Sequence, residues 1–127
     1  MMKKIIFLTF IAIVSYTHLQ AQKTNEFELI TSGKWHLEYM EMGGKKMELP
    51  AEIQKMNWVI FHPNGKQEGM EQGTKYVGKW EFDESTKTIR TNDLDGKGEQ
   101  KVISVTDKKL IVSVKEQGSV MIIGLKK

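Results

Sequence analysis

Two histidines, His36 and His62, carry the side chains best suited to bind a transition metal. Neither has a second histidine near it in sequence, and no H-E-x-x-H motif is present, so the spacing that places two imidazoles around zinc is missing. Strand alternation places His36 on the face opposite Trp35, and His62 directly precedes a turn. We therefore predict no metal site at either histidine.

The segment Asp93-Leu94-Asp95-Gly96, with Glu99 nearby, has the residue types of a calcium loop. An EF-hand with Gly96 at its sixth position would place Thr91 at the first ligand position and Val102 at the twelfth. Neither residue suits that role, and flanking helices are not expected. We interpret the segment as a hairpin loop in which Asp and Gly provide turn geometry.

Catalytic machinery is not evident in the sequence. There is no nucleophile elbow and no phosphate-binding loop, and the chain has no cysteine to act as a nucleophile. Acidic residues are numerous, but alternation directs most of them outward. We predict a protein that is not an enzyme and that has no catalytic residues and no cofactor.

Aromatic and methionine side chains are the remaining candidates for binding. If they face inward, they could line a cup for an apolar ligand, since methionine adapts its shape to irregular partners. An eight-stranded barrel is just wide enough to be filled by such side chains or to hold one small ligand, so a plain core is an equally good interpretation. The candidate ligand-binding residues are Tyr39, Trp58, Met70, Tyr76, Trp80 and Met121.

The N-terminus has the layout of a secretory signal peptide. Lys3 and Lys4 precede an apolar run from Ile5 to Val14, and Leu19-Gln20-Ala21 offers a cleavage site. The run spans about 10 residues, whereas a membrane-spanning helix needs about 20. We predict a signal peptide at residues 1–21, one domain at residues 22–127, a periplasmic or secreted location, and no membrane insertion after cleavage.

The charge and cysteine content exclude further classes of function. Removing Lys3 and Lys4 lowers the formal net charge from +3 to +1 (3 − 2), and the remaining charges alternate in sign. Such a surface attracts phosphate backbones weakly, so we predict no nucleic-acid partner. With no cysteine, the domain has no disulfide and depends on its core for stability.

From residue 33 onward the pattern is that of short strands separated by turns. The segment 22–32 is expected to be a short helical element, and Ala51 to Lys55 a short helical link. Trp35, Leu37 and Tyr39 are expected to share one face of the first strand. Eight or nine strands at regular spacing, without a long crossover helix, predict an all-β meander, and closure into a barrel would remove its edges.

Three motifs carry a resemblance to a known family. Gly33-Lys34-Trp35 opens the first strand, Phe61-His62-Pro63-Asn64-Gly65 ends an aromatic strand, and Gly78-Lys79-Trp80-Glu81-Phe82 forms a second glycine–tryptophan strand. The first resembles the G-x-W signature of the lipocalins, and the whole rhythm from Gly33 to Leu125 is similar to the small bacterial lipocalin-like domains. The resemblance implies a small antiparallel up-and-down β-barrel with Trp35 at its closed end. The only arginine is Arg90, so no arginine of the final strands packs across Trp35.

Two functions remain open at this stage. The first is an exported, non-catalytic lipocalin-like protein that binds a small hydrophobic or amphipathic molecule. The second is an envelope protein-interaction module, such as an inhibitor or immunity-type protein, with a filled barrel and another envelope protein as partner. The two-sided apolar character of Trp58–Phe61 and of Met121–Ile123 motivates the second.

Overall fold

A computed structural model describes residues 26–93 and 95–127 of the protein. The predicted signal peptide, residues 1–21, lies outside this range, as do the first residues of the predicted helical segment. In the described ranges no helix is long and apolar enough to cross a lipid bilayer. The elements are a helical segment at residues 26–30, β1 (Lys34–Met42), β2 (Lys45–Glu48), α2 (Ala51–Lys55), β3 (Trp58–Phe61), β4 (Lys66–Glu71), β5 (Thr74–Asp83), β6 (Thr88–Asp93), β7 (Gly96–Val105), β8 (Lys109–Glu116) and β9 (Ser119–Lys126).

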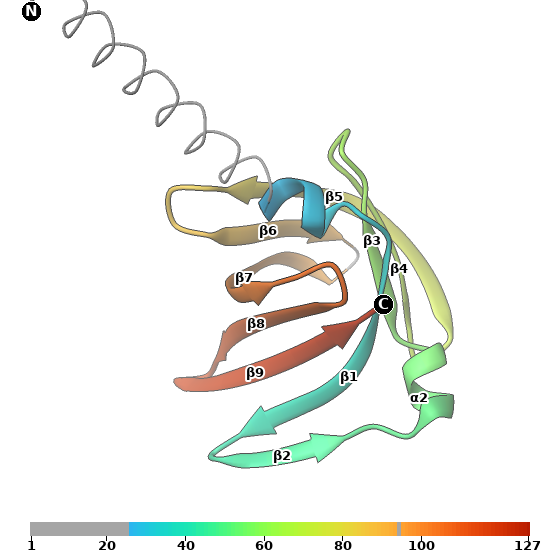
Figure 1. Ribbon diagram of the computed structural model, residues 1–127, viewed down its shortest axis with the longest axis vertical. Helices are drawn as coiled ribbons and strands as arrows, with labels where there is room; N and C mark the ends of the chain where they lie inside the picture. The colour runs from blue at the N-terminus through green and yellow to red at the C-terminus, as the bar shows by residue number, and fades with distance from the viewer. Residues whose placement is uncertain (1–25, 94) are drawn as a thin grey trace, which may run out of the picture.

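The described strands form one antiparallel sheet that closes on itself (Figure 1). The strand order is β2-β1-β3-β4-β5-β6-β7-β8-β9, and an additional pairing of β1 with β9 completes the circle. Eight strands make the barrel, and β2 is an extra strand attached to β1. This confirms the prediction of a small all-β, lipocalin-like up-and-down barrel with a short helical segment before it.

Short turns explain why sequential strands pair with one another. Gln72-Gly73 joins β4 to β5, and Gln117-Gly118 joins β8 to β9. In both turns the two residues have positive φ, 49° and 85° in the first and 48° and 82° in the second. Two-residue hairpins need this backbone because its twist matches the twist of the flanking strands, and glycine adopts it without steric cost.

The first strand has two different neighbours on one edge. Lys34 to His36 pair with β3, whereas Tyr39 to Met42 pair with β2. β1 and β3 therefore pair at only one end of the barrel. Along the sequence, β2 and α2 lie between these two strands. We call the other end of the barrel, where β1, β4, β6 and β8 finish, the mouth.

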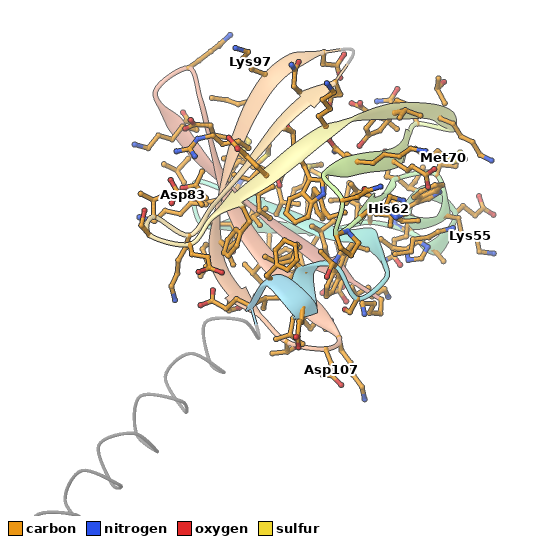
Figure 2. The ribbon with its side chains drawn as sticks, turned by 90° about the horizontal axis from the view of Figure 1, so that it is seen from above. Lys55, His62, Met70, Asp83, Lys97 and Asp107 are labelled. Carbon is orange, nitrogen blue, oxygen red and sulfur yellow. The ribbon has the colours of Figure 1, made fainter. Side chains whose placement is uncertain are left out.

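The closed end is filled by aromatic and aliphatic side chains. Trp35 is completely buried, and its indole Nε1–H donates a hydrogen bond of 2.9 Å to the carbonyl oxygen of Ile30. Phe27 stacks on Trp80, with 5.7 Å between ring centroids and 15° between planes. The helical segment thus covers this end of the barrel (Figure 1), and Figure 2 shows rings gathered beside it. The fully buried side chains are Ile30, Trp35, Phe61, Ile89, Leu110 and Val112.

A lysine covers the outer side of the Trp35 ring. The Nζ atom of Lys127 lies 4.8 Å from the ring centroid and donates a hydrogen bond of 2.6 Å to Ser32 Oγ. A cation over an indole face is attracted by the ring quadrupole, at about 0.5–1 kcal/mol for an exposed site. Lys127 therefore provides the positive charge that no arginine of the final strands supplies.

One prediction about the first strand is wrong. A β-bulge lies between Leu37 and Tyr39, so that Leu37 pairs with Leu125 but Tyr39 pairs with the next residue back, Gly124. Leu125 faces the core and Gly124 faces outward, because successive residues of a strand point to opposite sides. Tyr39 consequently lies on the outer face rather than beside Trp35 and Leu37.

The buried Trp35 should be essential for folding. Replacing it with alanine removes a large core side chain and should lower the free energy of unfolding by about 3–5 kcal/mol. Trp35→Phe keeps most of the ring but leaves the Ile30 carbonyl without its donor, at about 1–3 kcal/mol. Thermal and urea unfolding should show a larger loss of stability for Trp35→Ala than for Trp35→Phe. An unchanged melting temperature for Trp35→Ala would contradict the core assignment.

Candidate functional site

The structure divides the six predicted ligand-binding residues into two groups of three. Tyr39, Trp58 and Met70 lie on the outer face of the barrel, and Tyr76, Trp80 and Met121 lie on the inner face. The predicted cup is therefore not a single cluster. Whether any of the six contacts a ligand stays a prediction.

The three outer residues are held by neighbours on the same outer face. Trp58 lies between His36 and Met70 in the strand register, and the Nζ atom of Lys34 is 4.1 Å from the centroid of its ring. Tyr39 lies over Gly124, where a Cβ atom would collide with the ring. These contacts give both rings a structural role away from the interior.

Trp80 belongs to the closed core. It is 6% exposed, and its ring is 5.0 Å from that of Phe61 as well as stacked on Phe27. Its Nε1–H donates a hydrogen bond of 2.7 Å to the carbonyl oxygen of His62. Trp80 is therefore held in the core by two ring contacts and one hydrogen bond.

The inner face near the mouth is lined by small residues. Three glycines occupy inward-facing positions of the strands. Gly69 is in register with Tyr76, Gly78 with Gln67, and Gly98 with Thr91. The ring of Tyr76 lies across Gly69 and would overlap any side chain there. Gly78 and Gly98 are also in close contact, with Asp93 and with Thr91, so glycine at these positions allows neighbouring groups to approach the inner face of the sheet.

At the mouth, three carboxylates surround a hollow of about 260 Å³. Glu71 ends β4, and Asp93 and Asp95 flank the β6–β7 turn, so the meander brings both strand ends to one place. We call this the acidic hollow. Its lining residues are Glu71, Gln72, Thr74, Tyr76, Asp93 and Asp95.

The hollow disfavours negative charge. The pKa of Glu71 is raised by its partial burial, then by the charge of Asp95, by a hydrogen bond with Asp95, and by the charge of Asp93. The pKa of Tyr76 is also raised, mainly by burial and next by the charges of Asp93 and Glu71. The carboxylates therefore repel one another in the unliganded protein.

Behind Tyr76 lies a buried amide with one unsatisfied atom. Gln67 is 4% exposed and points into the barrel, and its Nε2 atom reaches the Tyr76 hydroxyl at 3.5 Å. Its Oε1 atom is buried and receives no hydrogen bond from the described residues. Buried acceptors are almost always paired, so this atom marks a place where a donor is missing.

Methionines gather on the opposite lip of the mouth. After the bulge, alternation turns Met40 and Met42 inward, where Met40 pairs with Met47 of β2 and Met42 pairs with Met121 of β9. Met42 and Met47 are 55% and 61% exposed. We call Met40, Met42, Met47 and Met121 the methionine lip.

Sequence reasoning missed most of this mouth. It included Tyr76 and Met121 but not Glu71 or Met40, and it assigned Asp93 and Asp95 to turn geometry alone. Pairing successive strands as hairpins would have placed the end of β4 near the end of β6. The direction of Met40 could not be found in that way, because it depends on the bulge.

A larger groove of about 880 Å³ lies on the outer face of β4 to β7. Its lining residue Arg90 lies 3.2 Å from Asp83 and 3.2 Å from Glu99. Hydrogen bonds from Ser85 and Arg90 lower the pKa of Asp83 to about 2. Lys97, another lining residue, extends outward (Figure 2). We regard this groove as a solvated outer surface.

Metal ligation is not supported by the described residues. In residues 26–93 and 95–127, no group of three histidine, aspartate or glutamate side chains is arranged to hold a metal ion. The Nε2 atom of His62 lies 3.2 Å from Glu68 Oε2, and His36 lies on the outer face, as alternation predicts.

Comparison with known proteins identifies the fold. No protein-family profile and no curated protein matches the chain. A lipocalin-like protein from Bacteroides uniformis has a similar structure, with a TM-score of 0.58, 16% identity, and coverage of 77% of this chain and 98% of that chain. A DUF4847 family protein from Bacteroides vulgatus is also similar in structure, with a TM-score of 0.59 and 14% identity. The match covers 78% of this chain and 94% of that chain. At these identities the likeness shows the fold, which is that of the small bacterial lipocalin-like domains.

The contact of Tyr39 with Gly124 can be tested by a double-mutant cycle. Gly124→Ala should lower the free energy of unfolding by about 1–3 kcal/mol, because the new methyl group collides with the ring. In a Tyr39→Ala background the same change should cost much less. Urea unfolding of the four proteins measures the coupling, and an equal cost in both backgrounds would show that the ring lies elsewhere.

The raised pKa of Glu71 predicts a pH-dependent stability. Because the folded-state pKa lies above the unfolded value, ionisation of Glu71 costs stability as the pH rises from the unfolded pKa through the folded one. Glu71→Gln removes this cost, so the variant should melt at a higher temperature than the parent at pH 7. The gain should vanish below the unfolded pKa, and a lower melting temperature at pH 7 would contradict the repulsion.

Proposed function

We propose that the protein is an exported, non-catalytic barrel that binds a small amphipathic molecule at its mouth. The observation that carries the proposal is the pairing of an apolar lip with a polar hollow at the same end of the barrel. β9 and β1 lie four strands away from β5 and β6 around an eight-stranded circle, so the methionine lip and the acidic hollow face each other. A molecule across the mouth would touch both.

The filled closed half limits how deep such a molecule can enter. Trp35, Phe61 and Trp80 occupy the interior below the mouth, each at most 6% exposed. Binding at the rim also explains why the methionines are accessible, whereas side chains of a dry core would be buried. Methionine has three rotatable bonds and a polarisable sulfur, which suits a lip that must fit a flexible apolar group.

A binding role is favoured over catalysis by the kind of polar groups present. Among the described residues that line the hollow, no side chain is arranged as a nucleophile beside a general base. The two similar structures are described as lipocalin-like and as a DUF4847 family protein, and neither description names a reaction. We therefore assign the hollow to recognition.

Export is part of the same proposal. The signal peptide expected at residues 1–21 would release a domain of residues 22–127 into the periplasm or beyond the outer membrane. A barrel that closes its sheet and has no cysteine needs neither a disulfide nor a metal to fold there.

One observation favours an interaction module as a second candidate. Among the described strands β2 pairs only with β1, so one edge of Lys45–Glu48 carries unpaired backbone groups. Such an edge can accept a strand from another protein. The side chains that face outward from this strand are charged, which protects the edge against self-association.

Native mass spectrometry of the protein purified from its own cells tests both candidates. The proposal expects the denatured mass of a chain that starts near residue 22. It also expects an excess mass in the native spectrum that disappears on denaturation. Met42→Gln and Met121→Gln should reduce the bound fraction severalfold because polar amides replace the apolar lip. Met70→Gln, which changes an outer methionine, should leave it unchanged.

Two outcomes would contradict the binding proposal. A bare protein that carries another polypeptide would favour the β2 edge as the working surface. A bound molecule that is lost with Met70→Gln, and retained with Met42→Gln and Met121→Gln, would place the site on the outer face.

A further inference from the structure

The acidic hollow has an unbalanced set of polar groups. Glu71, Asp93 and Asp95 supply only acceptors when they are ionised. Asp93 Oδ1 accepts the backbone N–H of Asp95 at 2.9 Å, and the buried Oε1 atom of Gln67 receives no hydrogen bond from the described residues. Within residues 26–93 and 95–127, no lysine, arginine or histidine forms an ion pair with any of the three carboxylates. The group that would complete this site carries hydrogen-bond donors and positive charge.

The buried amide connects this deficit to the interior of the barrel. Gln67 pairs with Gly78 in the strand register, and a Cβ atom on Gly78 would lie 2.9 Å from the Cβ of Asp93. Gln67 and Asp93 are therefore separated on the inner face by a residue without a side chain. The amide is directed toward the Tyr76 hydroxyl, which belongs to the wall of the hollow. The Oε1 atom of Gln67, which is buried and receives no hydrogen bond from the described residues, thus belongs to a side chain that lies behind the Tyr76 wall of the hollow, in the same cross-strand row as Gly78.

The charged residues around the hollow leave its repulsion uncompensated. Lys75 of β5 is in register with Met70, on the outer face, and Lys97 of β7 is in register with Asn92, also on the outer face. The raised pKa of Glu71 agrees with this arrangement, since burial and the charges of Asp95 and Asp93 all disfavour its ionised form. A bound cation would relieve the repulsion that the unliganded protein bears.

The size and spacing of the hollow favour an organic cation over a metal ion. Its three carboxylates do not form a group that could hold a metal ion, among the residues that the structure describes. Its volume of about 260 Å³ compares with about 30 Å³ for one water molecule in the liquid, which corresponds to roughly nine water-sized groups. An alkylated ammonium group fills such a space, and the Tyr76 ring in the wall can attract it through its π face.

We propose that the molecule bound at the mouth is a cationic amphiphile, with an ammonium-type head group in the acidic hollow and an apolar chain against the methionine lip. The proposal rests on the proposed function and names its ligand class. The ammonium group meets Glu71, Asp93 and Asp95, and a donor of the ligand, directly or through one water, reaches Gln67 Oε1. The chain then extends across the mouth toward Met42 and Met121.

Three probes that share one twelve-carbon chain test the head-group preference. Dodecyltrimethylammonium, dodecyl sulfate and dodecyl maltoside are titrated into the mature protein by isothermal calorimetry, each below its critical micelle concentration. The cationic probe should bind at least tenfold more tightly than the anionic probe, with the neutral probe between them. The difference should shrink as salt is raised, because screening weakens charge interactions at a partly exposed site.

Matched variants locate the preference on the structure. Asp93→Asn and Glu71→Gln should each weaken binding of the cationic probe severalfold and leave the neutral probe unchanged. Glu81→Gln removes the same charge from the outer face of β5 and should change neither. Circular dichroism checks folding, and Glu71→Gln, which relieves repulsion, keeps the test usable if Asp93→Asn fails to fold.

The outcomes separate the head-group inference from the proposed function. Equal binding of the three probes, or an equal effect of Glu81→Gln and Asp93→Asn, overturns the cation inference and keeps the amphiphile site. Binding of calcium alone, without the alkylammonium probe, overturns it in favour of a metal. If none of the probes binds and the protein from its own cells carries no small molecule, the proposed function itself is wrong.

Discussion

The β-bulge between Leu37 and Tyr39 is the constraint on which the barrel and its mouth depend. It lets β1 bend so that one edge follows β9 over its length while the other edge passes from β3 to β2. Closure leaves no strand edge inside the circle, which stabilises an antiparallel sheet of this size. The same extra residue reverses the alternation after it, so Tyr39 faces outward and Met40 and Met42 face the mouth. This irregularity therefore determines which side chains of β1 form the rim, and a second register shift lies between Val102 and Ser104 of β7.

The interior has a core of large side chains at its closed end and a small hollow at its mouth. At the closed end, two indole rings are fixed by hydrogen bonds to backbone carbonyls, Trp35 to Ile30 and Trp80 to His62. These bonds satisfy the only polar atom of each large ring, so the rings can be buried without an unpaired donor. Near the mouth, inward glycines replace large side chains. The core holds the strand ends in position, and the strand ends carry the groups that face solvent.

The acidic hollow has features that stability alone does not explain. Carboxylates that raise the pKa of their neighbour, and a buried Gln67 oxygen without a donor, both cost free energy in the unliganded protein. Substitutions that remove such costs are easily found, so these groups are suitable positions at which to test the proposed binding role. Arg90, by contrast, is matched by both Asp83 and Glu99 on the outer face. The mouth thus combines carboxylates that repel one another with a nearby buried oxygen that receives no hydrogen bond from the described residues.

The sequence by itself determined the features that depend on local patterns. Period-two alternation and turns such as Gln117-Gly118 predicted the strands, because residue type and neighbours along the chain decide local backbone geometry. The position of Trp35 at the closed end of a barrel was implied by the resemblance of Gly33-Lys34-Trp35 to the lipocalin signature. The tertiary structure alone decided which side chains meet across strands: the bulge that moved Tyr39 outward, the outer position of Trp58 and Met70, and the meeting of Glu71 with Asp93. Those depend on strand register and on one unpaired residue, and a shift of one residue reverses every face without changing the pattern from which a strand is recognised.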